Sequence, residues 1–371
     1  MIDFRKRFDG GSASFRDCIG AGPHENHPWT PVIITREEID AEVERLASLP
    51  LPQDGRRCAL ITHSSADPRA PGLAPSIEVL LSVLKPGERM RAFRHNATEV
   101  NFCIRGNGVS HTGDKRIEFA QYDVWNTPSY TTYRRENDGD DLQVCLTYSN
   151  APLLKFMQIY LAEDGPPAER GPAEEDEAEG DPRRNSPFGT LPIGTDGALL
   201  MPYEQVINPP PVVSPILFWP WREVKAELDK LAALGTDYVG RRLYLLYNPM
   251  TGRTNGTTPS FFATMTIRPP NIVDRPHRHA SAAINYYFHG SGRSSVAGNV
   301  YEWKAGDLML SAPGWTVHNH ASYGEHVHEL TVQDQPLNIL MESLLWQEDM
   351  KHPAVLLGTQ AGFTTNRTKL A

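Results

Sequence analysis

Short apolar or aromatic runs alternate with turn residues along the C-terminal half of the chain. The runs are Ala283–Phe288, Ser295–Val296, Val300–Trp303 and Leu308–Leu310. Turn signals at Gly290, Gly292 and Gly298-Asn299 separate them. Short strands joined by regular turns are typical of an antiparallel sandwich or barrel. The pattern therefore predicts a fold dominated by β-structure.

Two segments follow a helical period instead. Glu38–Ala47 and Glu223–Ala232 carry apolar residues at i, i+4 and i+7, which predicts an amphipathic helix in each. Thr35 is expected to be the N-cap of the first helix, with Glu38 completing a capping box. The sequence thus predicts a few helices flanking the strands.

The two predicted helices belong to a repeat with an offset of about 184 residues, a spacing that matches two copies of a whole domain. Gly106-Asn107-Gly108 aligns with Gly290-Ser291-Gly292, and Asp123 aligns with Asp307. The second copy has one more residue between Asp307 and Pro313 than the first has between Asp123 and Pro128, which predicts a β-bulge.

The repeat and the composition of the intervening segments divide the chain into five parts. We expect an irregular arm that could wrap the partner domain or a neighbouring subunit, a first domain, an acidic and proline-rich linker and crossover, a second domain, and a tail. Their respective bounds are 1–34, 35–160, 161–215, 216–350 and 351–371. The proline-dense stretch Phe188–Pro215 is predicted to be an extended crossover.

Composition narrows the classes of partner. The 371 residues carry a net charge of -9, but Glu163–Arg184 alone holds nine acids and three bases, or -6. The remainder is nearly balanced, which argues against a nucleic-acid partner. No window approaches eighteen consecutive apolar residues, so no membrane span is expected. Four scattered cysteines without a CxxC motif suggest reduced thiols in a cytoplasmic protein.

Histidines cluster in the second copy, where seven of the thirteen fall between residues 277 and 328. His277 and His279 on one strand would point to the same face, since side chains repeat every second residue. His318 could return from a later strand and complete three ligands of a metal site with open positions. The alternative is that each histidine lies at the surface or is a hydrogen-bonded core residue.

The first copy has lost two of these three histidines. Phe93 stands where His277 stands, Tyr133 stands where His318 stands, and only His95 remains. We therefore expect no metal there by the same route, and a structural and oligomerisation role for this domain. A different site that joins Glu99 and His111 to His95 is the alternative.

These motifs resemble those of bicupins, and specifically the gentisate 1,2-dioxygenase family, which includes salicylate and 1-hydroxy-2-naphthoate dioxygenases. The resemblance rests on His277-Arg278-His279, Gly290-Ser291-Gly292, Gly306-Asp307, Pro313–His320 and Tyr247-Asn248-Pro249. It covers most of residues 216–346 and, more weakly, 28–160. It implies two tandem cupin barrels, that is, double-stranded β-helices, and an assembly of two to four chains.

The resemblance also implies a function. Family members hold Fe(II) with three histidines and no carboxylate, and here Ala283 occupies the place of the fourth, acidic ligand of other cupins. We expect one Fe(II) per chain, in the C-terminal cupin, and a ring-cleaving dioxygenase that consumes O2 and a small hydroxylated aromatic substrate. The family usually carries its metal in the N-terminal cupin, and it has an arginine where this chain has Asn285, which puts gentisate itself in doubt.

The resemblance further suggests residues around the metal. His320 could act as the acid–base group, or it could only orient one of the metal-binding residues. Arg241 and Arg242 match a paired arginine motif, and one could bind a substrate carboxylate, whereas a surface arginine is the alternative. Asn285, Tyr286 and Trp315 could line the pocket, although aromatic residues of a barrel are more often core.

Two rival functions remain open at this point. A cupin could use its metal as a Lewis acid, as an isomerase, hydrolase or decarboxylase does. It could also be a non-catalytic bicupin that binds a small molecule or stores metal. Dependence on O2 distinguishes the dioxygenase from both.

Overall fold

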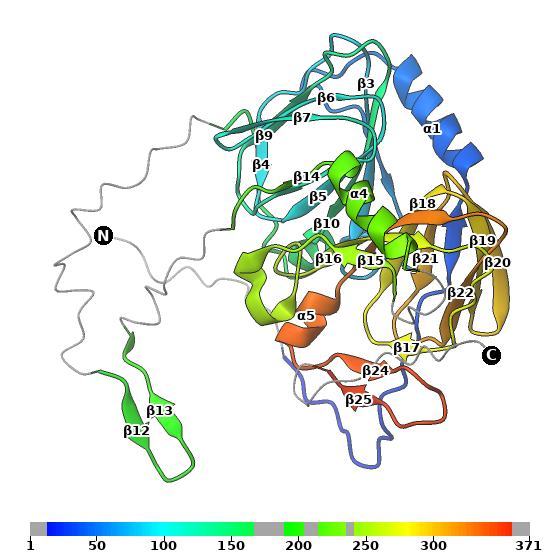
Figure 1. Cartoon of the computed structure of the whole chain (residues 1–371). Helices are drawn as coiled ribbons and strands as arrows, with labels where there is room; N and C mark the ends of the chain where they lie inside the picture. Colours follow the sequence, from blue (N-terminus) through cyan, green and yellow to red (C-terminus); the bar gives the residue numbers. More distant parts are fainter. Residues whose placement is uncertain (1–12, 167–188, 204–213, 235–240, 358–371) are drawn as a thin grey trace, which may run out of the picture.

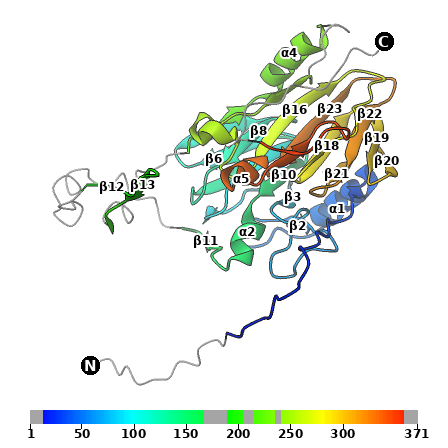
Figure 2. The ribbon, with the colours of Figure 1, turned by 90° about the horizontal axis from the view of Figure 1, so that it is seen from below.

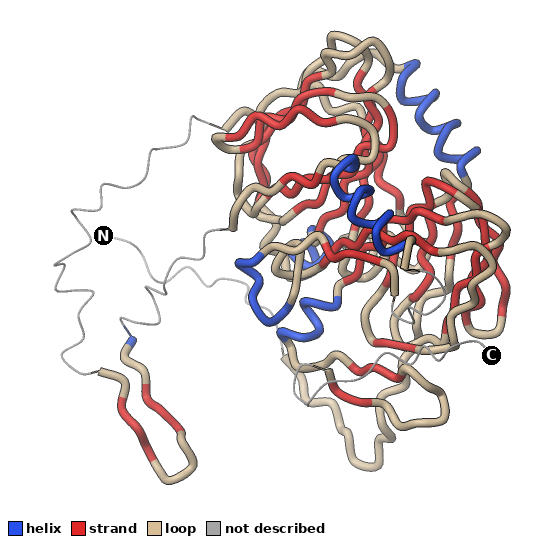
Figure 3. The backbone as a smooth tube through the Cα atoms, in the orientation of Figure 1, coloured by secondary structure: helices blue, strands red, loops and turns tan. Residues whose placement is uncertain are grey.

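Two β-barrels, one from each half of the chain, make up the body of the protein (Figure 1). The computed structural model describes residues 13–166, 189–203, 214–234 and 241–357. Most of the acidic segment Glu163–Arg184 and part of the predicted crossover lie outside these residues. Strands dominate the tube of Figure 3, and the helices lie at the periphery of the barrels. The prediction of a mostly β fold with two cupin barrels is confirmed.

The strands of the first barrel form two antiparallel sheets, and those of the second barrel form three. The first barrel contains β2 (Cys58–Ile61), β3 (Glu78–Leu84), β4 (Phe93–His95), β5 (Glu99–Arg105), β6 (Gly108–Thr112), β7 (Lys115–Phe119), β8 (Val124–Thr127), β9 (Tyr133–Glu136), β10 (Gln143–Ser149) and β11 (Ala162–Asp164). Its larger sheet has the order β14-β8-β5-β10-β3-β2, where β14 is Phe218–Trp219, and its smaller sheet has the order β11-β4-β9-β6-β7.

The second barrel repeats this plan. It contains β15 (Leu243–Leu245), β16 (Phe262–Arg268), β17 (Arg278–His279), β18 (Ala283–His289), β19 (Ser291–Val296), β20 (Asn299–Lys304), β21 (Leu308–Ala312), β22 (His318–Ser322) and β23 (Val327–Gln333). Its larger sheet has the order β1-β21-β18-β23-β16-β15, where β1 is Val32–Ile34. Strands β20-β19-β22 form the opposite wall, and β17 pairs with β24 (Leu345–Gln347), which pairs with β25 (Val355–Leu356).

The remaining elements connect or cover the barrels. They are the helices α1 (Arg36–Ser48), α2 (Ala151–Phe156), α4 (Trp221–Ala232) and α5 (Gln335–Leu340), the 3-10 helix η2 (Pro249–Thr254), and the strands β12 (Leu191–Ile193) and β13 (Ala198–Leu200). Both predicted amphipathic helices are present, and the predicted capping box of Thr35 and Glu38 is confirmed. Strands β12 and β13 form a hairpin that lies away from both barrels in Figures 1 and 2, so the predicted crossover is not extended throughout.

Each barrel receives the edge strand of its larger sheet from the other half of the chain. Strand β1, from the predicted arm, pairs with β21 of the second barrel, with Ile33 opposite Met309. Strand β14, from the start of the predicted second domain, pairs with β8 of the first barrel. The structural boundaries of the two barrels therefore interleave, whereas the predicted domains were simple consecutive segments.

Two equivalent aspartates each hold the start of one helix. Asp307 of the second barrel contacts α1, and Asp123 of the first barrel contacts α4. The backbone N–H of Arg36, at the start of α1, donates to Asp307 Oδ1 at 2.7 Å. Likewise, the backbone N–H of Trp221, at the start of α4, donates to Asp123 Oδ1 at 2.6 Å. The first N–H groups of a helix have no partner within the helix and carry partial positive charge, so a carboxylate satisfies and stabilises them.

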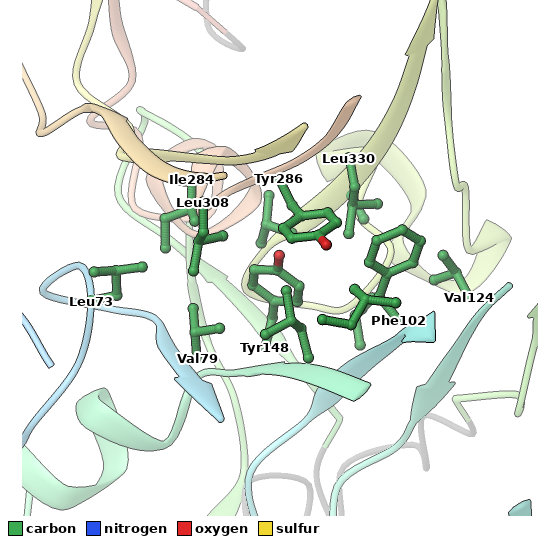
Figure 4. Close-up of a cluster of buried hydrophobic side chains, with 14 of the residues drawn as sticks. Leu73, Val79, Phe102, Val124, Tyr148, Ile284, Tyr286, Leu308 and Leu330 are labelled. Atoms are coloured by element: carbon green, nitrogen blue, oxygen red, sulfur yellow. The ribbon is translucent and has the colours of Figure 1, made fainter. Parts of the chain in front are cut away.

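A common apolar core lies between the two larger sheets. Figure 4 shows Phe102 and Tyr148 of the first barrel facing Tyr286 of the second barrel. The rings of Phe102 and Tyr286 meet edge to face with centroids 5.7 Å apart, a geometry that adds to the energy of apolar burial. The two barrels are therefore held together by a shared hydrophobic core and by the exchanged strands.

The predicted β-bulge is present on β21. The pairing of β18 with β21 shifts between Ala283, which faces Ala312, and Ile284, which faces Leu310, so Ser311 is the extra residue. The equivalent pairing of β5 with β8 in the first barrel runs without a shift. A bulge redirects the side chain that it adds. In this case it brings Ser311 into a cavity inside the second barrel.

Within the described residues, no helix has the length and apolarity that crossing a membrane requires.

The contact between Asp307 and α1 can be tested by mutation. We expect Asp307→Ala to lower the free energy of unfolding by about 1–2 kcal/mol, because the N-terminal N–H of α1 and the backbone N–H of Lys304 both lose their acceptor. Urea denaturation followed by circular dichroism measures the change. Asp114→Ala, at an exposed turn, is the control and should change stability by less than about 0.5 kcal/mol. Equal stability of the two variants would contradict the assignment.

Candidate metal centre

Three buried imidazoles converge inside the second barrel. His279 lies on β17, His318 begins β22, and His277 forms an isolated antiparallel bridge with His318. The ring centroids of His277 and His318 are 4.5 Å apart, and those of His279 and His318 are 4.7 Å apart. One ligand nitrogen from each ring lies within 4.8 Å of the other two. The predicted strand-borne pair and the returning third histidine thus meet in one place.

Hydrogen bonds to the backbone orient all three rings in the same way. The Nδ1 atom of each ring lies near a carbonyl oxygen two residues away along the chain. The pairs are His277 with Arg275 at 3.0 Å, His279 with Ser281 at 2.8 Å, and His318 with Thr316 at 2.8 Å. A carbonyl only accepts, so each Nδ1 carries the proton and each Nε2 keeps its lone pair. Such outer hydrogen bonds fix the tautomer of metal-binding histidines.

Burial keeps the three imidazoles neutral. It lowers the pKa of His318 to about 4. Burial, followed by the proximity of His318, holds the pKa of His277 and of His279 well below the ordinary value for histidine. Neutral imidazoles are the form that binds a metal, so protons do not compete for these nitrogens near neutral pH.

The donor set fits a first-row transition metal. Three imidazole nitrogens suit iron, copper, nickel or zinc, and three protein ligands leave further coordination positions for other molecules. Ala283, at the place of the acidic ligand in other cupins, is buried and lines the cavity. Among the described residues, these three histidines are the only cluster able to hold a metal.

A cavity of about 230 Å³ lies in front of the three nitrogens. Trp346 of β24 forms one wall and stacks on His279 with centroids 4.9 Å apart and ring planes 25° apart. This tryptophan faces His279 directly in the pairing of β17 with β24. Sequence reasoning missed Trp346, because β24 lies beyond the predicted barrel strands and carries no motif.

A buried ion network forms another part of the cavity wall. The guanidinium of Arg268 contacts Asp274 through Nη1, and Glu329 Oε1 lies 3.2 Å from Nη2. All three residues are buried and line the cavity. The backbone N–H of Asp274 also donates to the carbonyl of His320 at 2.9 Å, which joins the network to β22. Arg268 lies on β16, Glu329 lies on β23, and Asp274 lies in the loop after β16, so no local spacing in the sequence predicted this network.

Four of the suggested substrate-site residues line the cavity, namely Arg241, Arg242, Asn285 and His320. Arg241 lies beside the imidazoles, with its Nη2 atom 3.5 Å from His277 Nε2 and 3.6 Å from Glu348 Oε1. Arg242 is buried, and its Nε donates to the carbonyl of Leu231 in α4. The structure therefore gives the two arginines different surroundings.

Asn285 and His320 are both held by side-chain hydrogen bonds. Asn285 Nδ2 donates to Thr331 Oγ1 at 2.8 Å, and Ser311 Oγ donates to Asn285 Oδ1 at 2.5 Å. His320 Nδ1 lies 2.8 Å from Ser294 Oγ, which leaves Nε2 for other partners. Burial, followed by the charge of Arg268, holds the pKa of His320 well below its ordinary value, so this ring is also neutral.

The other two suggested residues lie outside the cavity. Tyr286 follows Asn285 on β18, and neighbouring side chains of a strand point to opposite faces, so it joins the core against Phe102. Trp315 lies in the turn before β22, where the guanidinium of Arg278 covers its ring at 4.4 Å from the centroid. The structure thus does not bring either aromatic residue to the three histidines.

The first barrel has Phe93, His95 and Tyr133 at the equivalent places, and Phe93 pairs with Tyr133 as His277 pairs with His318. His95 Nε2 lies 2.8 Å from Glu99 Oε1. His111 contacts Glu136 at 3.6 Å instead, so the alternative site that joined His95, Glu99 and His111 is not assembled.

Comparison with known proteins extends these observations. Residues 264–360, most of the second barrel, match the family model described as AraC-like ligand binding domain. The chain is 25% identical over 301 residues to 5-aminosalicylate 1,2-dioxygenase of Comamonas sp. This match covers 79% of this chain and 75% of that protein. The chain is 26% identical over 315 residues to gentisate 1,2-dioxygenase of Haloferax sp, a match that covers 83% of each.

The architecture also matches a solved structure. The crystal structure of salicylate 1,2-dioxygenase from Pseudaminobacter salicylatoxidans superposes with a TM-score of 0.70, over 87% of this chain and 89% of that chain. The sequence identity in this superposition is 16%. At this identity, the likeness shows that both barrels share the fold of that protein.

Metal analysis tests the candidate metal centre. We expect about one transition-metal ion per purified chain, and a loss of at least tenfold in affinity in His279→Ala, because one of three ligands is removed. Inductively coupled plasma mass spectrometry after dialysis measures the content. His95→Ala is the matched control in the first barrel and should retain the ion. A loss of metal in the control would show that the ion is bound in the first barrel, which would contradict the assignment to His277, His279 and His318.

Proposed function

We propose that this chain, a member of the gentisate and salicylate 1,2-dioxygenase-like cupin family, is a non-haem Fe(II) enzyme that opens the ring of a hydroxylated aromatic carboxylate. The related enzymes are aromatic ring-cleaving 1,2-dioxygenases, and this chain is an enzyme of that type. The proposal concerns the metal, the substrate class and the roles of individual residues.

One observation carries the proposal. Three neutral imidazoles present their Nε2 atoms to a cavity that is large enough for a small ring, with no acidic ligand in the set. Such a site leaves the charge of a bound cation uncompensated by its protein ligands, which favours an anionic substrate. When bound, Fe(II) would supply the activation of O2 and a point of attachment for the oxygen atoms of the substrate.

Arg241 is the residue we assign to the substrate carboxylate. Its Nη2 atom is 3.5 Å from His277 Nε2, so a carboxylate that it bound would lie beside the ligand nitrogens. Its ion pair with Glu348 is long, at 3.6 Å, and 36% of the arginine side chain is exposed. A planar guanidinium can bind a carboxylate in a bidentate manner. Arg242 is instead anchored to α4 and would shape the wall.

His320 is the residue we assign to proton transfer. Its ring is neutral, is oriented by Ser294, and lies with its centroid 5.7 Å from that of His318. A neutral imidazole can accept the proton of a ring hydroxyl as the substrate binds and return it to the product. Both atoms of O2 would end in the ring-opened dicarboxylic product, so no external reductant is needed.

The polar pair of Asn285 and Ser311 would contribute to the choice of substrate. Both face the cavity and are hydrogen-bonded to each other. An amide and a hydroxyl can hydrogen-bond a hydroxyl or amino substituent of a ring, but they supply no fixed positive charge. We therefore expect substituted salicylates or hydroxyanthranilates to be candidates alongside gentisate.

Two expectations from the sequence accompany this proposal. We expect a cytoplasmic location, in keeping with four free cysteines in the structure. We also expect an assembly of two to four identical chains, which size-exclusion chromatography with light scattering can measure.

Oxygen consumption tests the proposed reaction. We expect iron-loaded protein to consume one O2 for each molecule of substrate opened, in a screen of gentisate, salicylates, hydroxyanthranilates and hydroquinones with an oxygen electrode. Under anaerobic conditions, no substrate should be lost until air is admitted. Equal conversion without oxygen would show that the metal acts as a Lewis acid. Binding without conversion in either condition would favour a non-catalytic bicupin.

The role of Arg241 predicts a specific kinetic defect. We expect Arg241→Gln to raise KM for the substrate at least about tenfold, since a charge-assisted hydrogen bond contributes about 1.5–3 kcal/mol, while metal content stays unchanged. Arg253→Gln, at an exposed arginine paired only loosely with Glu342, is the matched control. An unchanged KM in Arg241→Gln would assign the carboxylate to another residue.

A further inference from the structure

The first barrel contains a cavity of its own. It lies at the place that is equivalent to the candidate metal centre of the second barrel. Its volume is also about 230 Å³, and Phe93, His95 and Tyr133 line it at the places of the three histidines. The duplicated barrel has thus lost the imidazoles but kept an internal space of the same size. Its wall also contains an unusual number of buried charged groups.

Most of these charges are paired within the protein. Lys155 Nζ lies 2.6 Å from Glu78 Oε2. Arg57 holds Glu88 in a bidentate contact at 2.6 and 2.9 Å. Each of these pairs is neutral as a unit, so neither leaves a net charge in the cavity wall.

His95 and Glu99 form a third pair. Burial lowers the pKa of His95, but the Glu99 carboxylate outweighs it, and the pKa lies above the ordinary value. Burial raises the pKa of Glu99, but His95 outweighs it, and the pKa lies below the ordinary value. The ion pair is therefore favoured, and Tyr133 Oη also donates to Glu99 Oε1 at 3.2 Å.

Arg56, which also lines the cavity, pairs with Asp54 at 2.9 Å and with Asp164 at 3.4 Å, so Arg135 is the cation that remains. Only 5% of it is exposed, its Nη2 atom donates to Ser82 Oγ at 2.9 Å, and its Nε has no hydrogen-bond partner. Within the parts of the chain that the structure describes, no carboxylate forms an ion pair with it. A guanidinium stays charged in proteins. Arg135 interacts with the Cys145 thiol and with the Glu99 carboxylate, but Glu99 already pairs with His95. An anion that enters the cavity would therefore give this buried cation an ion-pair partner of its own.

Glu99 adds a second unsatisfied polar atom in the same cavity. Its Oε2 atom is buried and has no partner among the described residues, although Oε1 has two. A carboxylate oxygen can only accept, so it calls for a donor such as a ligand hydroxyl.

The other walls fit a flat apolar ring. Phe93 meets Tyr133 edge to face at 6.0 Å, and Tyr160 covers His95 at 5.8 Å. Leu60 and Leu80 line the side formed by β2 and β3. Aromatic and aliphatic walls with a few convergent polar groups are typical of a small-molecule site.

We propose that the first barrel holds a metal-free binding site for a small aromatic carboxylate, with Arg135 as its counter-ion and Glu99 as the acceptor for a ring hydroxyl. This site goes beyond the proposed catalytic function, since it requires neither a metal nor turnover. It gives the first barrel a ligand of its own, in addition to the structural role expected from the loss of the histidines.

Binding of benzoate to the metal-free full-length protein, followed by isothermal titration calorimetry, tests the proposal. We expect Arg135→Gln to lower the affinity of one class of benzoate sites at least about tenfold. Arg241→Gln, the matched change in the second barrel, should leave that class intact. Benzamide, a neutral analogue of similar shape, should bind there at least about tenfold more weakly than benzoate.

A second variant covers the case in which Arg135→Gln does not fold. Leu80→Trp keeps the cation but fills the cavity, so it should abolish the same class of sites, and near-ultraviolet circular dichroism would verify its fold. Unchanged benzoate binding in a folded variant of either kind would overturn the proposal. So would equal binding of benzamide, or no binding to the wild type at millimolar benzoate. None of these results involves oxygen consumption, so they test the first-barrel site independently of the proposed dioxygenase function.

Discussion

The reciprocal exchange of strands and helix contacts is the constraint on which the rest of the structure depends. Strand β1 completes the sheet of the second barrel, and β14 completes the sheet of the first. In each case a helix follows the exchanged strand, and its first backbone N–H donates to an aspartate of the barrel that receives the strand. An open sheet edge would expose unpaired backbone groups, so neither larger sheet is complete without the other half of the chain. The exchange also brings the two sheets face to face over one core.

This arrangement sets the position of the candidate metal centre. Strand β21 receives β1 on one side and β18 on the other, and it carries the bulge at Ser311. The chain then turns and enters β22 at His318, which pairs with His277. The strand that receives β1 thus carries the bulge and leads directly to one histidine of the candidate metal centre. A change at the interface between the barrels could therefore alter the shape of the cavity.

The sequence predicted features that depend on local spacing, including the two helices, the capping box of Thr35, the bulge and the convergence of three histidines. It did not predict features that depend on long-range pairing. Trp346 reaches the site only because β24 pairs with β17. The sequence suggested both Asn285 and Tyr286 for the pocket, but adjacent residues of a strand face opposite sides of the sheet. The face that carries Tyr286 is buried between the two barrels, and no local pattern in the sequence predicts this contact.

The two cavities show how one fold can treat buried charge in opposite ways. In the second barrel, burial keeps three imidazoles neutral, and the single positive charge of Arg268 faces two carboxylates, Asp274 and Glu329. The attraction for an anion there would come from a bound cation and Arg241. In the first barrel, aromatic side chains replace two imidazoles, and Arg135 is a buried cation with which no carboxylate of the described residues forms an ion pair. A fixed guanidinium needs no metal to attract a carboxylate, so loss of the metal ligands need not mean loss of binding.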